Sequence, residues 1–507
     1  MKYFLFLLYF PLFVLGQSNP VDAIRKYRQA NEHNLLEVYF DFLRIPNIAA
    51  DLPNIRKNAI WISDHMKSKG ISNVQLLYPQ TPDTPPAVYG EVMVPGATKT
   101  IVFYAHYDGQ PVDSTKWIKG LHPFKPQLAS GSLSGATELI SWPSKASSFD
   151  PEWRIYGRGS SDDKAGVFTI INAYAALIYS KISPGVNIKF FFEGEEEAGS
   201  THLNEIFSQH HDLLKSDIWV ICDGPVHQSG QKQVVFGVRG DTHIELTVYG
   251  SLRPLHSGHY GNWAPNPAMA LAQLLASMKN TQGDVTIKGF YDDVIPLSDT
   301  EKKALSNLPP VEQQLQRELG FIKAERPGSL NENLNLPSLN INGIQSAGVG
   351  TQSANIIPTK AIASIDLRLV AGNDWKKQQQ KVVDHIKSMG YHVTEKEPSA
   401  VERAAHDKLC MVVCSEGYNA QKTPMDNPMA QSIVKAVSAA LTQPPVLLPT
   451  LGGSLPLFIF EEMLNAKPVT VPIANHDNNQ HAENENIRIK NLWDGLEMFA
   501  SIMIMKK

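Results

Sequence analysis

Metal-ligand residues follow apolar runs at five separate places in the chain. These residues are His106 with Asp108, Asp162, Glu196 with Glu197, Asp223 and His481. Imidazole and carboxylate ligands, with no thiolate needed, suit Zn²⁺ or Mn²⁺. A site of three or four protein ligands per ion leaves room for a water between two ions, which activates a nucleophile and polarises a carbonyl. The pattern therefore indicates a two-metal hydrolytic site.

Each motif taken alone has a plainer interpretation. A histidine after a strand is often a hydrogen-bonded core group, and the carboxylates of Asp162 and Asp163 could cap the following helix. Adjacent carboxylates nevertheless repel one another unless a cation is near. Glu196 and Glu197 also follow an apolar strand directly, so one could bind a metal while the other takes a proton from the bound water.

Alternating strand and helix patterns position these residues. Buried strands are predicted over 100–105, 186–192 and 217–222, and their carboxyl ends are followed by His106, by Glu196 with Glu197, and by Asp223. Open α/β sheets hold their ligands at that edge. Helices are predicted over 21–43, 55–69 and 164–179. We therefore expect an α/β catalytic domain with a largely parallel sheet flanked by helices.

The pattern changes in the middle of the chain. An α+β unit is expected there, with strands over 234–249, 361–370 and 391–395 and helices over 267–278, 309–319 and 374–389. The α/β pattern then returns, with helices over 429–441, 455–460 and 489–505 and a strand over 468–472. We predict a catalytic domain over 17–233 and 421–507, interrupted by a lid or dimerisation domain over 234–420.

Residues 1–16 resemble a secretory signal, with Lys2, an apolar run and small residues before Gln17. On this pattern we expect a cleaved signal and export to a periplasm or the cell exterior; an uncleaved anchor is the alternative. No later run is long enough to span a membrane. The net charge of −4, without a basic run, argues against a nucleic-acid partner.

The chain has three cysteines. Cys410 and Cys414 could be neighbours on a helix, and the sequence leaves open whether they are bonded. Cys222 is expected to pack in the core, because the other candidate ligands are oxygen or imidazole. Residues 130–148, rich in Ser, Gly and Ala, are expected to form a surface loop or to lie near the mouth of the site.

Six ordered motifs resemble a known family of dinuclear zinc metallopeptidases. The family includes carnosinase, cytosolic nonspecific dipeptidase and aminoacylase, and the carnosinase-like dipeptidase branch is the nearest match. The motifs are His106-x-Asp108, Arg158-Gly159-x-x-Asp162, Glu193-Gly194-x-Glu196-Glu197, Cys222-Asp223, Leu255-His256-Ser257-Gly258 and His481-x-x-Asn484-Glu485. The resemblance runs from about residue 33 to the C-terminus.

The resemblance implies two Zn²⁺ or Mn²⁺ ions per subunit, with Asp162 bridging them. The first ion would be held by His106, Asp162 and Asp223. The second would be held by Asp162, Glu197 and His481. The resemblance also implies a cis peptide bond between Asp162 and Asp163.

Catalytic roles follow from the same resemblance. Glu196 would act as general base and later as acid, and Asp108 would orient His106. His256 would reach the active site of a partner subunit and stabilise the oxyanion. The site would then be complete only in a homodimer.

Substrate contacts are also implied by the resemblance. Arg368 would bind the free α-carboxylate of the substrate, and Asn355, Ser454 and His256 would add further contacts. The expected function is a metal-dependent dipeptidase. An amidohydrolase of N-acyl amino acids is an alternative, as is a non-catalytic, metal-stabilised binding protein. Asn355 stands where close relatives carry Thr, so the substrate preference stays open.

Overall fold

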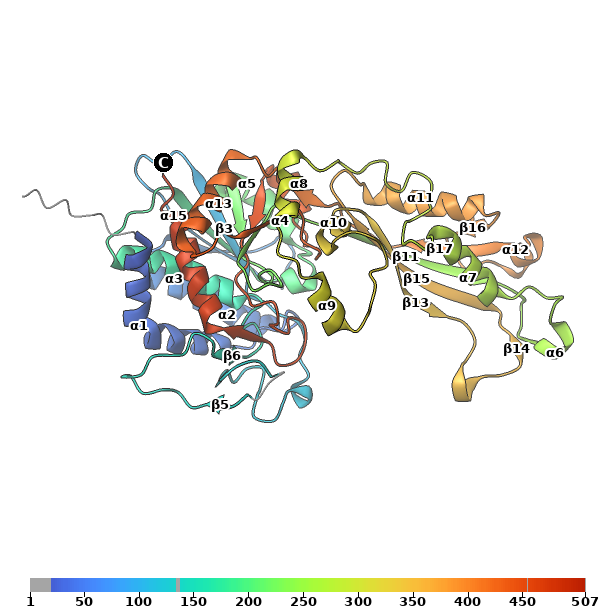
Figure 1. Ribbon diagram of the computed structural model, residues 1–507, viewed down its shortest axis with the longest axis horizontal. Coiled ribbons are helices and arrows are strands. Elements are labelled where there is room, and N and C mark those ends of the chain that lie inside the picture. Colours follow the sequence, from blue (N-terminus) through green and yellow to red (C-terminus); the bar gives the residue numbers. More distant parts are fainter. Residues whose placement is uncertain (1–19, 134–136, 454, 507) are drawn as a thin grey trace, which may run out of the picture.

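The computed structural model describes residues 20–133, 137–453 and 455–506. These residues form a large lobe on an eight-stranded sheet and a smaller lobe on a five-stranded sheet (Figure 1). The predicted fold class is confirmed: the chain has a mixed α/β architecture of several sheets flanked by helices. Among the described residues, no helix combines the length and apolar content needed to cross a membrane.

The large sheet has the strand order β1-β2-β7-β3-β8-β20-β9-β19. Its strands are β1 (Ser72–Leu77), β2 (Ala87–Val92), β3 (Thr100–His106), β7 (Asn187–Glu193), β8 (Ile218–Ile221), β9 (Gln233–Val235), β19 (Val446–Leu448) and β20 (Pro468–Thr470). The central neighbours β7, β3, β8 and β20 run parallel. Parallel strands need cover on both faces, and β7 is buried at every position. Because these four strands run in the same direction, their carboxyl ends meet at one edge of the sheet.

Helices cover both faces of the large sheet. One layer contains α1 (Pro20–Leu43), α2 (Leu52–Ser68), α3 (Lys164–Tyr179), α13 (Pro428–Ala440) and α15 (Ile489–Met503); the other contains α4 (Leu203–Gln209), α5 (His211–Leu214) and α14 (Phe458–Leu464). Alternate residues of β3 serve the two layers, since Phe103 belongs to one apolar cluster and Tyr104 to the other. A peripheral sheet adds β4 (Gln127–Ala129), β5 (Leu139–Ile140), β6 (Arg154–Tyr156) and β21 (Asn486–Arg488).

The small sheet has the order β13-β15-β11-β17-β16. Its strands are β11 (Gly240–Tyr249), β13 (Ser338–Gln345), β15 (Lys360–Leu369), β16 (His392–Thr394) and β17 (Leu409–Cys414). Helices α7 (Pro267–Met278) and α11 (Trp375–Ser388) pack on one face through an apolar cluster. At the far end lie β12 (Leu255–His256), α6 (Ser257–Tyr260), β14 (Ile356–Ile357) and α12 (Ala400–Ala405), while α8 (Asp299–Ser306), α9 (Glu312–Leu319) and α10 (Leu330–Leu334) lie toward the large lobe (Figure 1).

A two-stranded ribbon joins the lobes. It consists of β10 (Gly237–Val238) and β18 (Gln421–Lys422), which pair antiparallel. The chain thus enters and leaves the small lobe at adjacent positions. The predicted domain boundaries at residues 234 and 420 fall beside this ribbon.

Some expected elements differ from the structure. Cys410 and Cys414 lie on β17 rather than on a helix, and both are free thiols. Four residues along a strand span roughly 13 Å, so the two cannot form a disulfide. The helix predicted from 309 begins at Glu312, after a Pro-Pro pair. Residues 130–148 contain part of the β4–β5 hairpin, and none of their described members lines the cavity described below.

Candidate metal centre

His106 and Asp162 meet at the carboxyl edge of the large sheet. His106 is the last residue of β3, and its Nε2 lies 2.9 Å from Asp162 Oδ1. Asp162 lies in the turn before α3, where the peptide bond to Asp163 is cis, as the resemblance implied. The Asp163 side chain accepts a hydrogen bond from Gly166 and caps α3. Of the two adjacent carboxylates, only Asp162 faces the histidine.

His481 approaches Asp162 from the opposite side. Its Nε2 lies 3.1 Å from Asp162 Oδ2 and 3.2 Å from Glu197 Oε2. Gln110 Nε2 also donates to Glu197 Oε2, at 2.8 Å. The carboxylate of Asp162 therefore lies between two imidazoles, as expected for a bridging ligand.

Asp108 holds the turn that carries the two glutamates. Its carboxylate accepts hydrogen bonds from the backbone N–H groups of Glu196, at 3.2 Å, and Glu197, at 2.9 Å. The same carboxylate lies 3.4 Å from His106 Nδ1. One buried aspartate thus fixes both the histidine at the end of β3 and the turn that follows β7.

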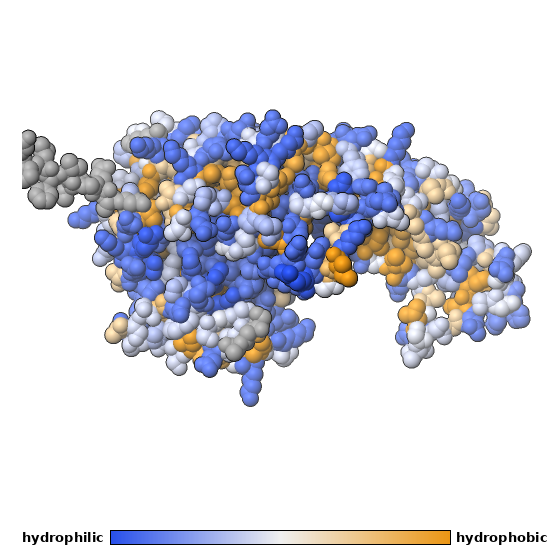
Figure 2. Space-filling view, viewed as in Figure 1, coloured by the Kyte–Doolittle hydropathy of each residue, from blue (hydrophilic) through white to orange (hydrophobic). Residues whose placement is uncertain are grey.

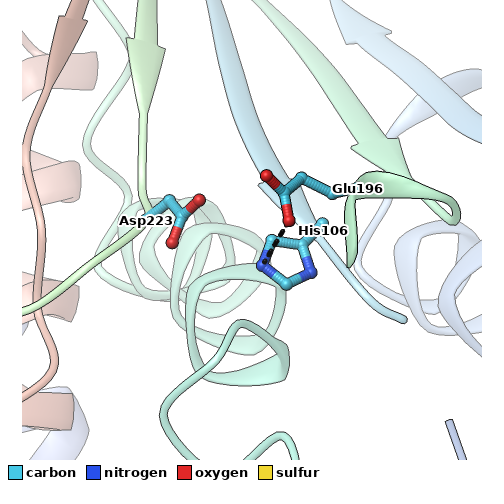
Figure 3. Close-up of side chains that lie close together, drawn as sticks. All are labelled: His106, Glu196 and Asp223. Atoms are coloured by element: carbon cyan, nitrogen blue, oxygen red, sulfur yellow. Dashed lines mark ion pairs between the residues drawn. The ribbon is translucent and has the colours of Figure 1, made fainter. Parts of the chain in front are cut away.

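Figure 3 shows Glu196 and Asp223 on either side of a common space, next to the ring of His106. Glu196 Oε2 lies 3.9 Å from His106 Nε2. Ligand atoms of His106, Glu196 and Asp223 all lie within 4.8 Å of one another, and the same is true of His106, Asp162 and Glu197. The predicted ligands and the predicted base therefore form one cluster.

The electrostatics of this cluster indicate a shortage of positive charge. Burial raises the pKa of Asp223 to about 6, and repulsion from Asp162 and Glu197 adds to it. Burial and neighbouring carboxylates also raise the pKa of Glu196 well above its usual value. Hydrogen bonds to Asp162 and Glu197 raise the pKa of His481 to about 10. Divalent cations would relieve this repulsion, and the nitrogen and oxygen donors fit Zn²⁺ or Mn²⁺.

Glu485 supports the turn that carries Asp162. It accepts hydrogen bonds from the backbone N–H groups of Gly159, Ser161 and Asp162 at 2.9 to 3.0 Å. Arg158 Nη1 donates to the same carboxylate at 2.8 Å. Arg158 and Glu485 belong to two separate sequence motifs, and the sequence gave no signal that they pair. Gln110 was missed for the same reason, since nothing in its neighbourhood marks it as a contact of Glu197.

Other predicted site residues lie away from the cluster within one chain. His256 and Asn355 are neighbours, since β12 pairs with β14 and Ser257 N donates to Asn355 O at 2.9 Å. Both are exposed, and β14 and α6 lie at the end of the small lobe remote from the large lobe (Figure 1). Arg368 lies on β15 and pairs with Asp366. Ser454 lies outside the described residues.

A cavity of about 790 Å³ opens beside the cluster. The cluster residues Asp162, Glu196, Glu197, Asp223 and His481 line one side of it. Small-lobe residues Glu416, Gly417 and Tyr418 line another part, and the visible face of the molecule is hollowed between the lobes (Figure 2). A cavity of this size fits a small ligand that touches both lobes.

Residues 102–505, most of the chain, match the pattern that defines peptidase family M20/M25/M40. The chain belongs to this family. The family recognised from the motifs is therefore confirmed, and the M20 peptidase is an enzyme of the hydrolase class. Members use divalent metals, in agreement with the candidate ligand groups.

The M20 peptidase is similar to proteins named as dipeptidases. Human Beta-Ala-His dipeptidase is 25% identical over 446 residues, which cover 86% of this chain and 81% of that protein. Cys-Gly metallodipeptidase DUG1 of Candida albicans is 26% identical over 472 residues, covering 89% and 90%. The solved structure of the M20 family metallo-carboxypeptidase Sso-CP2 from Sulfolobus solfataricus matches with a TM-score of 0.73 at 25% identity, covering 93% and 98%.

The prediction of export is wrong by comparison with these relatives. The Cys-Gly metallodipeptidases to which the M20 peptidase aligns over most of its length are cytosolic enzymes. Residues 1–16, which alone carried the prediction, lie outside the described residues.

Proposed function

We propose that this M20 peptidase hydrolyses dipeptides that carry a free C-terminal carboxylate. The observation that carries the proposal is the position of Asp162 between His106 and His481, at the wall of a cavity of about 790 Å³. One Zn²⁺ or Mn²⁺ ion would be held by His106, Asp162 and Asp223. A second would be held by Asp162, Glu197 and His481.

Ions bound there would polarise the scissile carbonyl and lower the pKa of water. Glu196 is the residue proposed to move the proton. It lines the cavity, and its raised pKa suits a group that takes a proton from the attacking water and gives it to the leaving amine. Asp108 holds the backbone of Glu196, so it keeps this carboxylate at the cavity wall.

The names of the relatives support a dipeptide rather than an N-acyl amino acid as substrate. Two of the similar proteins are named for Beta-Ala-His and Cys-Gly dipeptides, and the aminoacylase alternative is not favoured. The intact set of ligands and base also argues against a purely structural metal site.

The proposed working unit is a homodimer in which His256 and Asn355 reach the partner's cavity. Two observations support it. His256 is exposed and remote from the cluster of its own chain. Apolar side chains on the segments that follow α6 and precede β14 are also exposed, including Trp263 at 80% and Val349 at 84%. These side chains would be buried if this end of the small lobe packed against a second copy of the chain.

A substrate panel with metal analysis tests the proposal. Purified protein loaded with Zn²⁺ or Mn²⁺ is assayed on Cys-Gly, β-Ala-His and Ala-Ala, and on N-acetyl-alanine as the acylated comparison. We expect hydrolysis of at least one dipeptide, faster than N-acetyl-alanine, with two ions bound per chain. Faster turnover of the acylated amino acid would move the assignment to an amidohydrolase, and no turnover on any substrate would reject an enzyme of either type.

A further inference from the structure

Four ionisable residues form a square on the small sheet, which we call the charge square: Asp241, His243, Asp366 and Arg368. In the register of β11 with β15, Asp241 lies opposite Arg368 and His243 opposite Asp366. Their strand neighbours Ile244 and Leu367 point into the apolar cluster beneath α7 and α11. Side chains alternate along a strand, so the charge square faces away from the helices.

Within this square, Arg368 faces both carboxylates through its Nε. This atom lies 3.2 Å from both carboxylate oxygens of Asp366 and 3.5 Å from Asp241 Oδ1. A guanidinium presents its donors in a rigid fork, so a contact at Nε orients the Nη end as well. A ligand carboxylate that approaches Nη1 and Nη2 end-on would not compete with Asp366.

The charge square is linked to the cavity wall through the backbone of Asp241. Asp241 exchanges two backbone hydrogen bonds with Tyr418, at 3.0 and 2.9 Å, and Tyr418 lines the cavity wall. A second guanidinium, Arg239, precedes the square by two residues and donates to the carbonyl of Arg368. Burial and the charge of Arg368 lower the pKa of Arg239 to about 10. Two carboxylates therefore lie where two guanidinium groups would otherwise repel one another.

We infer that Asp366 and Asp241 are positioning residues that orient the guanidinium of Arg368 toward the carboxylate of the substrate. The inference rests on the proposed function, in which Arg368 binds that carboxylate. Asp366 is expected to contribute more to this orientation than Asp241, since its side chain is only 10% exposed and both of its oxygens face Arg368 Nε. A metal ion bound by the charge square is disfavoured, because the guanidinium of Arg368 already neutralises the two carboxylates.

The test compares a dipeptide with its own amide. In metal-loaded enzyme, Asp366→Asn should raise KM for the best dipeptide of the panel by about tenfold and leave kcat within about twofold. Asp241→Asn should do the same to a smaller extent, and Asp366→Glu should restore most of the loss. The C-terminal amide, measured as a competitive inhibitor, should bind wild type and Asp366→Asn equally, because it lacks the carboxylate. Glu245→Gln, which removes a carboxylate bonded to Ser364 on the same sheet face, is the matched control and should change neither constant.

Three outcomes would overturn the inference. An unchanged KM in Asp366→Asn, or an equal loss for dipeptide and amide, would reduce Asp366 to a structural role. Loss of a third bound Zn²⁺ in Asp366→Asn would instead make the square a metal site. Arg368→Ala separates the carboxylate-binding role of Arg368 from the positioning role of Asp366. If Arg368→Ala leaves KM unchanged, Arg368 does not bind the substrate carboxylate. If Arg368→Ala raises KM but Asp366→Asn has the wild-type KM, only the positioning role of Asp366 is rejected.

Discussion

Asp108 shows how a single buried carboxylate can serve two parts of a site. It faces His106 and also binds the backbone of Glu196 and Glu197, so the histidine and the glutamates cannot shift independently. Supporting groups of this kind orient metal ligands and set their basicity.

Glu196 is proposed to carry the proton, and its removal should separate chemistry from metal binding. We expect Glu196→Gln to lower kcat by at least about 10²-fold, because general acid–base catalysis contributes that much or more. The content of bound metal should stay at the wild-type value when measured by atomic absorption. Retained peptidase activity would exclude Glu196 as the general base, and loss of metal would reassign it as a ligand.

Glu485 should matter for stability, because it neutralises Arg158 and holds three backbone N–H groups of one turn. Removing one partner of a buried ion pair costs about 3–5 kcal/mol, so Glu485→Gln should lower the free energy of unfolding by about 3 kcal/mol. Denaturant unfolding measures the change. Glu483→Gln, at a partly exposed neighbouring position, is the control, and an equal effect of both changes would contradict the argument.

The meeting of His106, Glu196, Glu197 and Asp223 could be predicted from the sequence because each follows a strand of the large sheet, and parallel strands share one carboxyl edge. Asp162 and His481 lie in turns outside these strands, so only the family resemblance placed them with the other candidates. The charge square could not be predicted. Asp241 and Asp366 are 125 residues apart in number, and only the register of β11 with β15 brings them together.

Single elements of the fold followed local signals to different degrees. Helices over 164–179 and 267–278 were predicted at their observed bounds, because Asp163 and Asn266 provide clear N-caps. Strand β13 was missed, since its sequence SLNINGIQ is mostly exposed and lacks an apolar period. Strand β17 was missed because its short apolar run fits a helix as well as a strand.

The packing of α2 against α3 predicts a loss of stability in acid. Burial lowers the pKa of His65 to about 3, while Asn172 Nδ2 lies 3.3 Å from its Nε2. The unfolded chain binds a proton near pH 6.5 and the folded one does not, so stability is full above about 6.5 and falls toward pH 3. At pH 5 the loss from this group should be about 1–2 kcal/mol. Thermal unfolding at pH 7 and pH 5 should show a smaller fall in Tm for His65→Gln than for wild type; equal falls would exclude His65 as the cause.

At the scale of the whole molecule, the residues proposed for one reaction lie at distant places in a single chain. The cluster lies in the large lobe, and His256 lies at the remote end of the small lobe (Figure 1). From the sequence, the placement of His256 away from the active site of its own chain could be predicted only through the resemblance to a family.

Mixing two inactive variants tests the proposed sharing of sites. Glu196→Gln lacks the base and His256→Ala lacks the oxyanion donor, and we expect each alone to have little activity. A mixed dimer has one cavity with Glu196 that receives His256 from its partner. Random exchange of equal amounts should therefore restore about one quarter of the wild-type activity. Activity that stays at the level of the single variants after subunit exchange would place His256 outside the partner's site.

The ribbon of β10 and β18 makes the small lobe an insertion that could be removed or exchanged as one continuous segment. All strands of the eight-stranded sheet come from residues outside 240–420, so excising that stretch would take none of them. Val238 and Gln421 are already paired, and a two-residue hairpin turn could join them. The excised portion would carry Arg368, His256 and Asn355, and the remainder would keep His106, Asp162 and His481. Exchange of this lobe between relatives would then alter which molecules are selected, while the cluster around Asp162 and the proposed base Glu196 would stay unchanged.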